Sequence, residues 1–180
     1  MTTLTRLRTL AFAGITMLLL AGGPLATAHQ TTTDADLEAV RTATADFDDL
    51  AAAETAGYAL LKDKDGIACI ANPDGGAMGV HYANGALVEA GKIDAAKPQV
   101  LVYEPTTTGS LQLAAVEYVV LQEMWDAEHS APPELFEQEF MLTPAGNRYG
   151  LPAFYSLHAW AWKANPSGEF AMWNPDVHCA

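Results

Sequence analysis

The spacing of apolar residues predicts an amphipathic helix near the start of the mature chain. The apolar residues that recur at helical steps are Leu37, Val40, Phe47 and Leu50. That spacing places them on one face of a helix, while the aspartates between them lie on other faces. Thr33 is a suitable N-cap, and Gly57 can end the helix. We therefore predict a helix over residues 34–56.

Three apolar segments in the middle of the chain have the composition of strands. The first is short, at residues 78–82, and the next two are at residues 100–104 and 111–121. The last two are separated by residues 105–110, which contain Pro, Gly and Ser and have the length of a hairpin loop. We therefore expect these two strands to pair antiparallel.

The last third of the chain predicts a helix at each of its ends and a strand between them. Residues 122–128 have the pattern of a short helix, and residues 136–142 that of a strand. Pro152 is suited to a first helical turn before the apolar run 153–162, and Asn165-Pro166 would stop the helix. Together the elements predict an α+β fold, in which an antiparallel sheet packs against an N-terminal and a C-terminal helix.

The first 28 residues have the pattern of a secretory signal peptide. Arg6 and Arg8 make a positive start, residues 10–21 are apolar but too short to span a bilayer, and Ala26-Thr27-Ala28 offers a cleavage site. We therefore predict residues 29–180 as one exported domain, periplasmic or extracellular, with no membrane insertion after cleavage.

The charge of the chain excludes some partners. The formal net charge is −13 at pH 7, and removing Arg6 and Arg8 with the signal peptide makes the mature protein more acidic still. Such a surface repels phosphate backbones and anionic membranes. We therefore expect a small molecule or a metal ion as the partner, and no nucleic acid.

The chain has two cysteines, Cys69 and Cys179. An even number of cysteines in an oxidising compartment predicts a disulfide, and a bond at Cys179 would hold the chain end in place. A metal-binding or redox pair is the alternative, but the two residues are not spaced as CxxC.

Several segments together resemble a family of exported bacterial proteins of uncharacterised function. They are MGVHY, LVYEP, VEYVV, LHAWAWKANPSG and WNP followed by a near-terminal Cys, and the resemblance covers roughly residues 55–180. It implies export and a single domain, and it implies no activity.

Four ionisable residues lie in otherwise apolar segments and are the candidate chemistry of this chain: His81, Glu104, Glu117 and His158. A carboxylate on a buried strand face is costly unless it is neutral, paired or bound to a cation. Imidazoles and carboxylates together suit a divalent transition metal such as Zn, Mn, Fe or Cu. The alternative is ordinary structural pairing, because the four residues are far apart in the sequence.

Aromatic residues offer a further candidate site. We interpret Tyr82, Tyr155 and Trp162 as walls of a ligand pocket, although such residues are equally suited to a hydrophobic core. His29 would become the first residue after cleavage, and its amine and imidazole could chelate copper; an incidental terminal histidine is the alternative.

Three functions are compatible with these residues. A metal- or small-ligand-binding domain comes first, because no nucleophile motif or cofactor fingerprint supports a named reaction. The second is an enzyme, such as a hydrolase, that uses the same histidines and glutamates for acid–base or metal chemistry. The third is a structural or interaction protein with a buried hydrogen-bond network.

Overall fold

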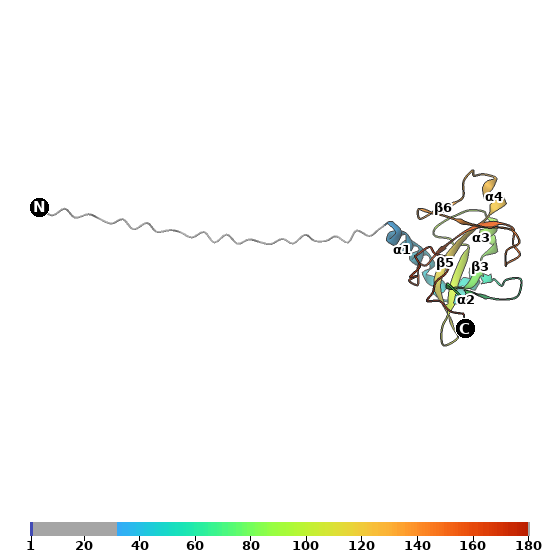
Figure 1. The fold of residues 1–180 in the computed structure, drawn as a ribbon, viewed down its shortest axis with the longest axis horizontal. Helices are drawn as coiled ribbons and strands as arrows, with labels where there is room; N and C mark the ends of the chain where they lie inside the picture. Colours follow the sequence, from blue (N-terminus) through green and yellow to red (C-terminus); the bar gives the residue numbers. More distant parts are fainter. Residues whose placement is uncertain (2–31, 180) are drawn as a thin grey trace.

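The computed structural model describes Met1 and residues 32–179 of the chain (Figure 1). Residues 2–28 of the predicted signal peptide, and His29, lie outside the described residues. Within the described part, no helix is both long enough and apolar enough to cross a membrane.

An antiparallel sheet of seven strands forms the centre of the domain and confirms the α+β class. Its strands run in the order β1-β3-β4-β5-β9-β8, and β2 also pairs with β3. The predicted hairpin is confirmed, because β4 and β5 pair antiparallel. The long strands are β3 (Gly76–Ala83), β4 (Val100–Pro105), β5 (Leu111–Leu121) and β9 (Phe154–Ala159). The short ones are β1 (Ala59–Leu60), β2 (Cys69–Asn72) and β8 (Met141–Thr143).

The helix predicted at residues 34–56 is divided into three parts. They are α1 (Thr32–Thr44), a 3₁₀ turn (Ala45–Asp48) and α2 (Leu50–Thr55). Asp49 is the break: its backbone is extended, and its carboxylate accepts a hydrogen bond from the Ala51 N–H to cap α2. Aspartate favours caps over helix interiors for this reason. Two short helices follow, α3 (Gly85–Glu89) and α4 (Gln122–Asp126), the second inside the range predicted for it.

The helix predicted after Pro152 is wrong, because residues 154–159 form strand β9. This strand pairs with β5 on one side and β8 on the other, and all its residues are buried. A strand covered on both faces does not alternate between apolar and polar residues, so periodicity cannot distinguish its sequence from that of a buried helix.

The strand predicted at residues 136–142 is also corrected. Phe136 and Glu137 have positive φ angles, which turn the chain between β6 (Glu134–Leu135) and β7 (Gln138–Glu139). Only the end of the predicted range joins the main sheet, as β8.

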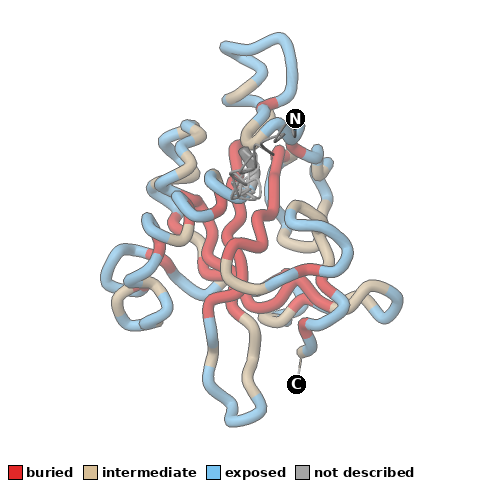
Figure 2. The backbone as a smooth tube through the Cα atoms, turned by 90° about the vertical axis from the view of Figure 1, so that its left-hand side faces the viewer, coloured by how far each residue is buried: buried red, intermediate tan, exposed pale blue. Residues whose placement is uncertain are grey.

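The sheet is covered on both faces, and its strands carry most of the buried residues (Figure 2). On the first face, which we call the helix-covered face, Leu37 and Val40 of α1 belong to the same core as Tyr103 and Tyr118 of the sheet. The second face, which we call the opposite face, carries a smaller core. That core contains Val100, Val102, Ala115, Val119, Phe154 and Trp160.

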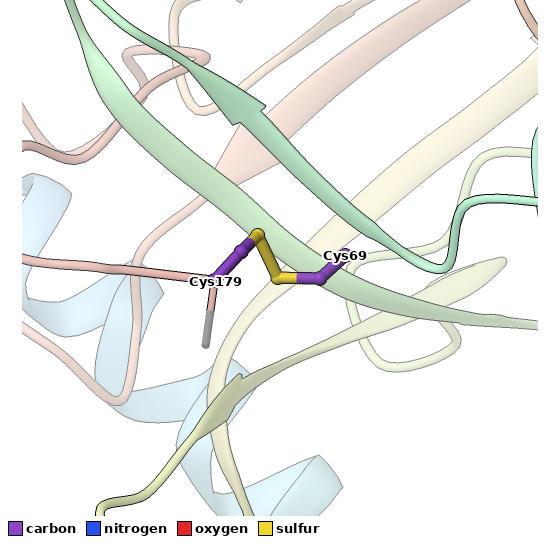
Figure 3. The surroundings of a disulfide bond; sticks show 2 residues. All are labelled: Cys69 and Cys179. Atoms are coloured by element: carbon purple, nitrogen blue, oxygen red, sulfur yellow. A yellow bond between two sulfur atoms is a disulfide. The ribbon is translucent and has the colours of Figure 1, made fainter.

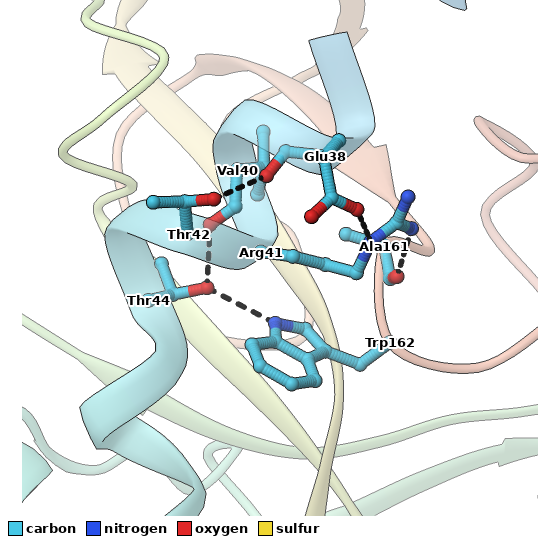
Figure 4. A network of polar contacts seen from close by, with 7 residues as sticks. All are labelled: Glu38, Val40, Arg41, Thr42, Thr44, Ala161 and Trp162. Carbon is cyan, nitrogen blue, oxygen red and sulfur yellow. Dashed lines mark hydrogen bonds and ion pairs between the residues drawn. The ribbon is translucent and has the colours of Figure 1, made fainter. Parts of the chain in front are cut away.

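A side-chain network joins α1 to the chain that follows β9 (Figure 4). Arg41 donates a hydrogen bond to the Ala161 carbonyl, and the Trp162 indole donates to Thr44 Oγ1. The Thr44 hydroxyl in turn donates to the Val40 carbonyl one turn earlier. These bonds hold the N-terminal helix against the sheet, although α1 and β9 are far apart in the sequence.

The C-terminal segment packs against the core of the opposite face through Val177 and is held by a Cys69–Cys179 disulfide (Figure 3), as predicted. Ala77 and Asn174 form a bridge with hydrogen bonds in both directions. Gly76 permits this approach: its φ is +87°, and a Cβ there would collide with the Asn174 carbonyl.

We predict that removing this disulfide lowers the free energy of unfolding by about 2–4 kcal/mol, because the bond constrains a long loop in the unfolded chain. The loop spans a sequence separation of 110 residues. Urea denaturation of the Cys69→Ser, Cys179→Ser double variant measures this loss. Two free thiols in the intact, unreduced wild-type protein would contradict the prediction.

Candidate metal centre

Three of the four predicted residues meet on the opposite face of the sheet: His81 on β3, Glu117 on β5 and His158 on β9. We call them the His-Glu-His cluster. Glu117 pairs directly across the ladder with His158. His81 lies two strands from Glu117. On the intervening strand β4, Val102 pairs with His81 and Val100 pairs with Glu117. The carboxylate therefore reaches one imidazole straight across and the other diagonally over β4.

The cluster is compact and buried. His158 Nδ1 is 3.6 Å from Glu117 Oε1, and His81 Nε2 is 3.8 Å from Glu117 Oε2. The two imidazole planes are perpendicular, with their ring centres 6.0 Å apart. His81, Glu117 and His158 are only 1%, 8% and 4% exposed. Three ionisable groups are thus gathered where water has little access.

The cluster is not a hydrogen-bonded network. Both distances from the carboxylate to the imidazoles exceed hydrogen-bond length. By hydrogen-bond geometry, neither nitrogen of His81 has a partner among the described residues, although the Gly79 backbone acts to raise the pKa of this imidazole, and His158 Nε2 has no partner either. Buried polar atoms are rarely left in this condition, so these nitrogens call for a ligand or a functional explanation.

Burial disfavours the charged form of each member of the cluster. It lowers the pKa of His81 to about 4, against an opposing effect of the Glu117 carboxylate. It also lowers the pKa of His158 to about 4. Burial raises the pKa of Glu117, although His81 and the Ser156 hydroxyl act in the other direction. Both imidazoles are therefore neutral at pH 7, which is the form that binds metals.

The donor set fits a divalent transition metal. One ligand atom from each residue can be chosen so that all lie within 4.8 Å of one another. Around a tetrahedral zinc, adjacent ligand atoms are about 3.3 Å apart, given bonds of about 2.0–2.1 Å. The shorter distances in the cluster exceed this by only a few tenths of an ångström. These two distances run to different oxygens of Glu117, and the widest separation among the three ligand atoms, up to 4.8 Å, would have to close by up to about 1.5 Å around a zinc ion.

Glu104 does not belong to the cluster. Its carboxylate lies 2.9 Å from Lys163 Nζ, in an ion pair. Glu104 pairs across the ladder with Gln112, whereas Glu117 is opposite Val100. The four-residue offset between Val100 and Glu104 corresponds to about 13 Å along the strand, beyond the reach of a side chain.

The three aromatic residues predicted as pocket walls lie away from the cluster. Tyr82 and Tyr155 are buried in the core of the helix-covered face, and Trp162 packs against that core. Alternation along β3 explains the result for Tyr82, since adjacent residues such as His81 and Tyr82 point to opposite faces. Tyr155 is likewise an odd number of residues from His158 on β9.

A loop that the sequence did not single out covers the cluster. The Tyr149 ring meets the His81 ring edge-on, with centres 6.3 Å apart. Asn147 organises the loop: its amide donates to carbonyls of Pro144 and Leu151, and its carbonyl accepts from the Tyr149 N–H. Arg148 anchors the loop by donating to the buried Asp63 carboxylate at 2.9 Å. An Asn in a turn-rich stretch is a signal for such a loop, but not for the surface it covers.

Comparisons with protein-family models, curated proteins and solved structures find no significant match to this chain. The geometry of the cluster therefore carries the functional argument alone.

We predict that the metal-free protein loses stability as the pH falls from about 6.5 to about 4. In this window the unfolded chain protonates His158 while the folded protein does not. The raised pKa of Glu117 acts oppositely, because the folded protein binds that proton first as the pH falls. His158→Gln should therefore flatten the pH dependence, by at most about 1.4 kcal/mol per pH unit.

Urea denaturation in the presence of a chelator, repeated at intervals between pH 4 and pH 7, measures both slopes. Equal slopes for the wild-type protein and the variant would show that His158 is protonated alike in the folded and unfolded states.

Proposed function

We propose that this protein binds a divalent transition metal through His81, Glu117 and His158. The observation that carries the proposal is that three buried metal-ligating side chains converge while three of their four imidazole nitrogens lack a hydrogen-bond partner among the described residues. A metal would give one nitrogen of each imidazole a partner, and it would let the Glu117 carboxylate stay ionised.

A purely structural role has less support. A buried polar network stabilises a fold when its members are hydrogen-bonded, and a half-satisfied one is worse than an apolar core. The distances of 3.6 and 3.8 Å within the cluster lack those bonds. Metal binding explains why these three side chains converge, whereas a hydrogen-bonded structural network does not.

The number of ligands favours a site that does more than hold the fold together. Structural zinc sites usually have four protein ligands, while catalytic sites have three and keep a position for water or substrate. Two histidines and one carboxylate match zinc sites of that kind and non-haem iron(II) sites. We therefore propose a metal with at least one exchangeable position, and a metal-dependent enzyme is the extension of this proposal.

We also propose that the protein is exported, and that it belongs to the family of exported bacterial proteins that it resembles. The Cys69–Cys179 disulfide supports export, because such bonds persist in oxidising compartments. The positive, apolar and small-residue stretches of residues 1–28 support it independently.

We predict that the purified full-length protein binds about one equivalent of Zn²⁺ or Co²⁺ and that Glu117→Gln weakens binding more than about 100-fold. Loss of an outer partner alone typically weakens metal binding 10–100-fold, and loss of a ligand should cost more. Titration calorimetry, together with the visible spectrum of the Co²⁺ form, measures the effect. Metal should also raise the melting temperature of the wild-type protein.

Glu104→Gln is the matched control. It makes the same chemical change on the neighbouring strand β4, at a carboxylate that pairs with Lys163 instead of the cluster. The control should bind metal as the wild-type protein does. Metal binding that survives Glu117→Gln unchanged, or is absent from the wild-type protein, would refute the proposed site.

A further inference from the structure

We propose that the cavity beside the His-Glu-His cluster binds a small monocarboxylate with an apolar body, held at its carboxylate by the metal and by Arg148. This inference rests on the proposed metal site and adds the chemical class of its ligand. It follows from the cavity walls, the unpartnered donors and the charge.

The cavity is adjacent to the cluster and small. It has a volume of about 280 Å³, and Glu117 and His158 both line it. Ligand pockets for drug-sized molecules typically have volumes of about 300–1,000 Å³, so this one suits a smaller molecule. A ligand in it lies directly against two of the three proposed metal ligands.

Most of the remaining wall is apolar. It is formed by Met78 of β3, Phe154 of β9, Tyr149 of the covering loop, and Met172 and Trp173 of the C-terminal segment. Thioether and aromatic groups favour an apolar ligand body and adapt to its shape. A strongly hydrophilic molecule would leave polar groups unpaired against this wall.

The polar groups of the cavity include unpartnered donors. Arg148 Nε is buried and has no hydrogen-bond partner among the described residues, while another nitrogen of the same guanidinium pairs with Asp63. His158 Nε2 is also buried without a partner. With Nδ1 bound to the metal, this nitrogen must carry the proton and is a donor. The cavity therefore offers donors that an oxyanion can accept from.

The charge of the metal-loaded site also favours an anion. The two positive charges of a divalent metal exceed the single negative charge of Glu117, and the two neutral histidines add no charge. Arg148 is compensated by Asp63. One positive charge is left uncompensated in a site of low polarity, where a bound metal is the dominant local charge. A carboxylate neutralises it, occupies the exchangeable metal position and accepts from Arg148.

Binding of benzoate and 3-methylbutanoate to the Co²⁺-loaded full-length protein tests the inference. Both should change the visible cobalt spectrum with saturable dependence on concentration. Acetate, which lacks the apolar body, and benzyl alcohol, which lacks the charge, should bind at least tenfold more weakly. The metal-free protein should bind neither carboxylate measurably in calorimetry.

Two variants locate the site. Thr143→Phe fills the cavity from β8 and should abolish carboxylate binding while Co²⁺ still binds; Leu142→Phe, at an exposed neighbour outside the cavity, is its control. Arg148→Lys keeps a cation for Asp63 but removes Nε, and should weaken binding about tenfold or more. This second variant keeps the test valid if the first does not fold.

The outcomes separate the two proposals. Failure of the wild-type protein to bind Co²⁺ refutes the metal site, and this inference falls with it. Binding of Co²⁺ with no response to either carboxylate refutes only the ligand assignment. Carboxylate binding that is independent of metal, or unaffected by both Thr143→Phe and Arg148→Lys, also overturns the assignment.

Discussion

Burial of both faces of strand β5 is the constraint on which the rest of the structure depends. Val116, Tyr118 and Val120 face the helix-covered core, while Ala115 and Val119 face the other core. Both layers must therefore be built before the strand is stable, one from α1 and α2 and the other from the loops and the C-terminal segment. Glu117 lies on the second face, so the same burial that stabilises the fold places its carboxylate beside two imidazoles.

The polar groups of this strand and its neighbours show two different solutions to burial. The Tyr103 and Tyr118 hydroxyls donate to the Phe47 and Ala95 carbonyls, and Gln99 accepts from the Val119 N–H. These groups are satisfied within the protein. Three of the four imidazole nitrogens of the cluster are not. The contrast within one sheet supports a bound ion as the missing partner of the cluster.

Local signals in the sequence predicted much of the sheet and most of the cluster. The hairpin of β4 and β5 was recognisable from its strand residues and its loop, and His81, Glu117 and His158 from their apolar surroundings. The face of the sheet that each residue occupies was less predictable. Val102 pairs with Ala115 but Tyr103 with Leu113, so Ala114 is an extra residue that moves Leu113 to the other face from Ala115. Periodicity cannot reveal such a bulge, nor separate the buried strand β9 from a helix, and the covering loop depends on contacts distant in sequence.

The disulfide has a consequence for the order in which the protein matures. Met172 and Trp173 line the cavity, and the segment that carries them is fixed by a bond at Cys179. Synthesis therefore supplies the anchor of this wall after every strand of the sheet has been made. Oxidation of the two thiols then fixes this wall, so completion of the cavity depends on conditions in which thiols are oxidised.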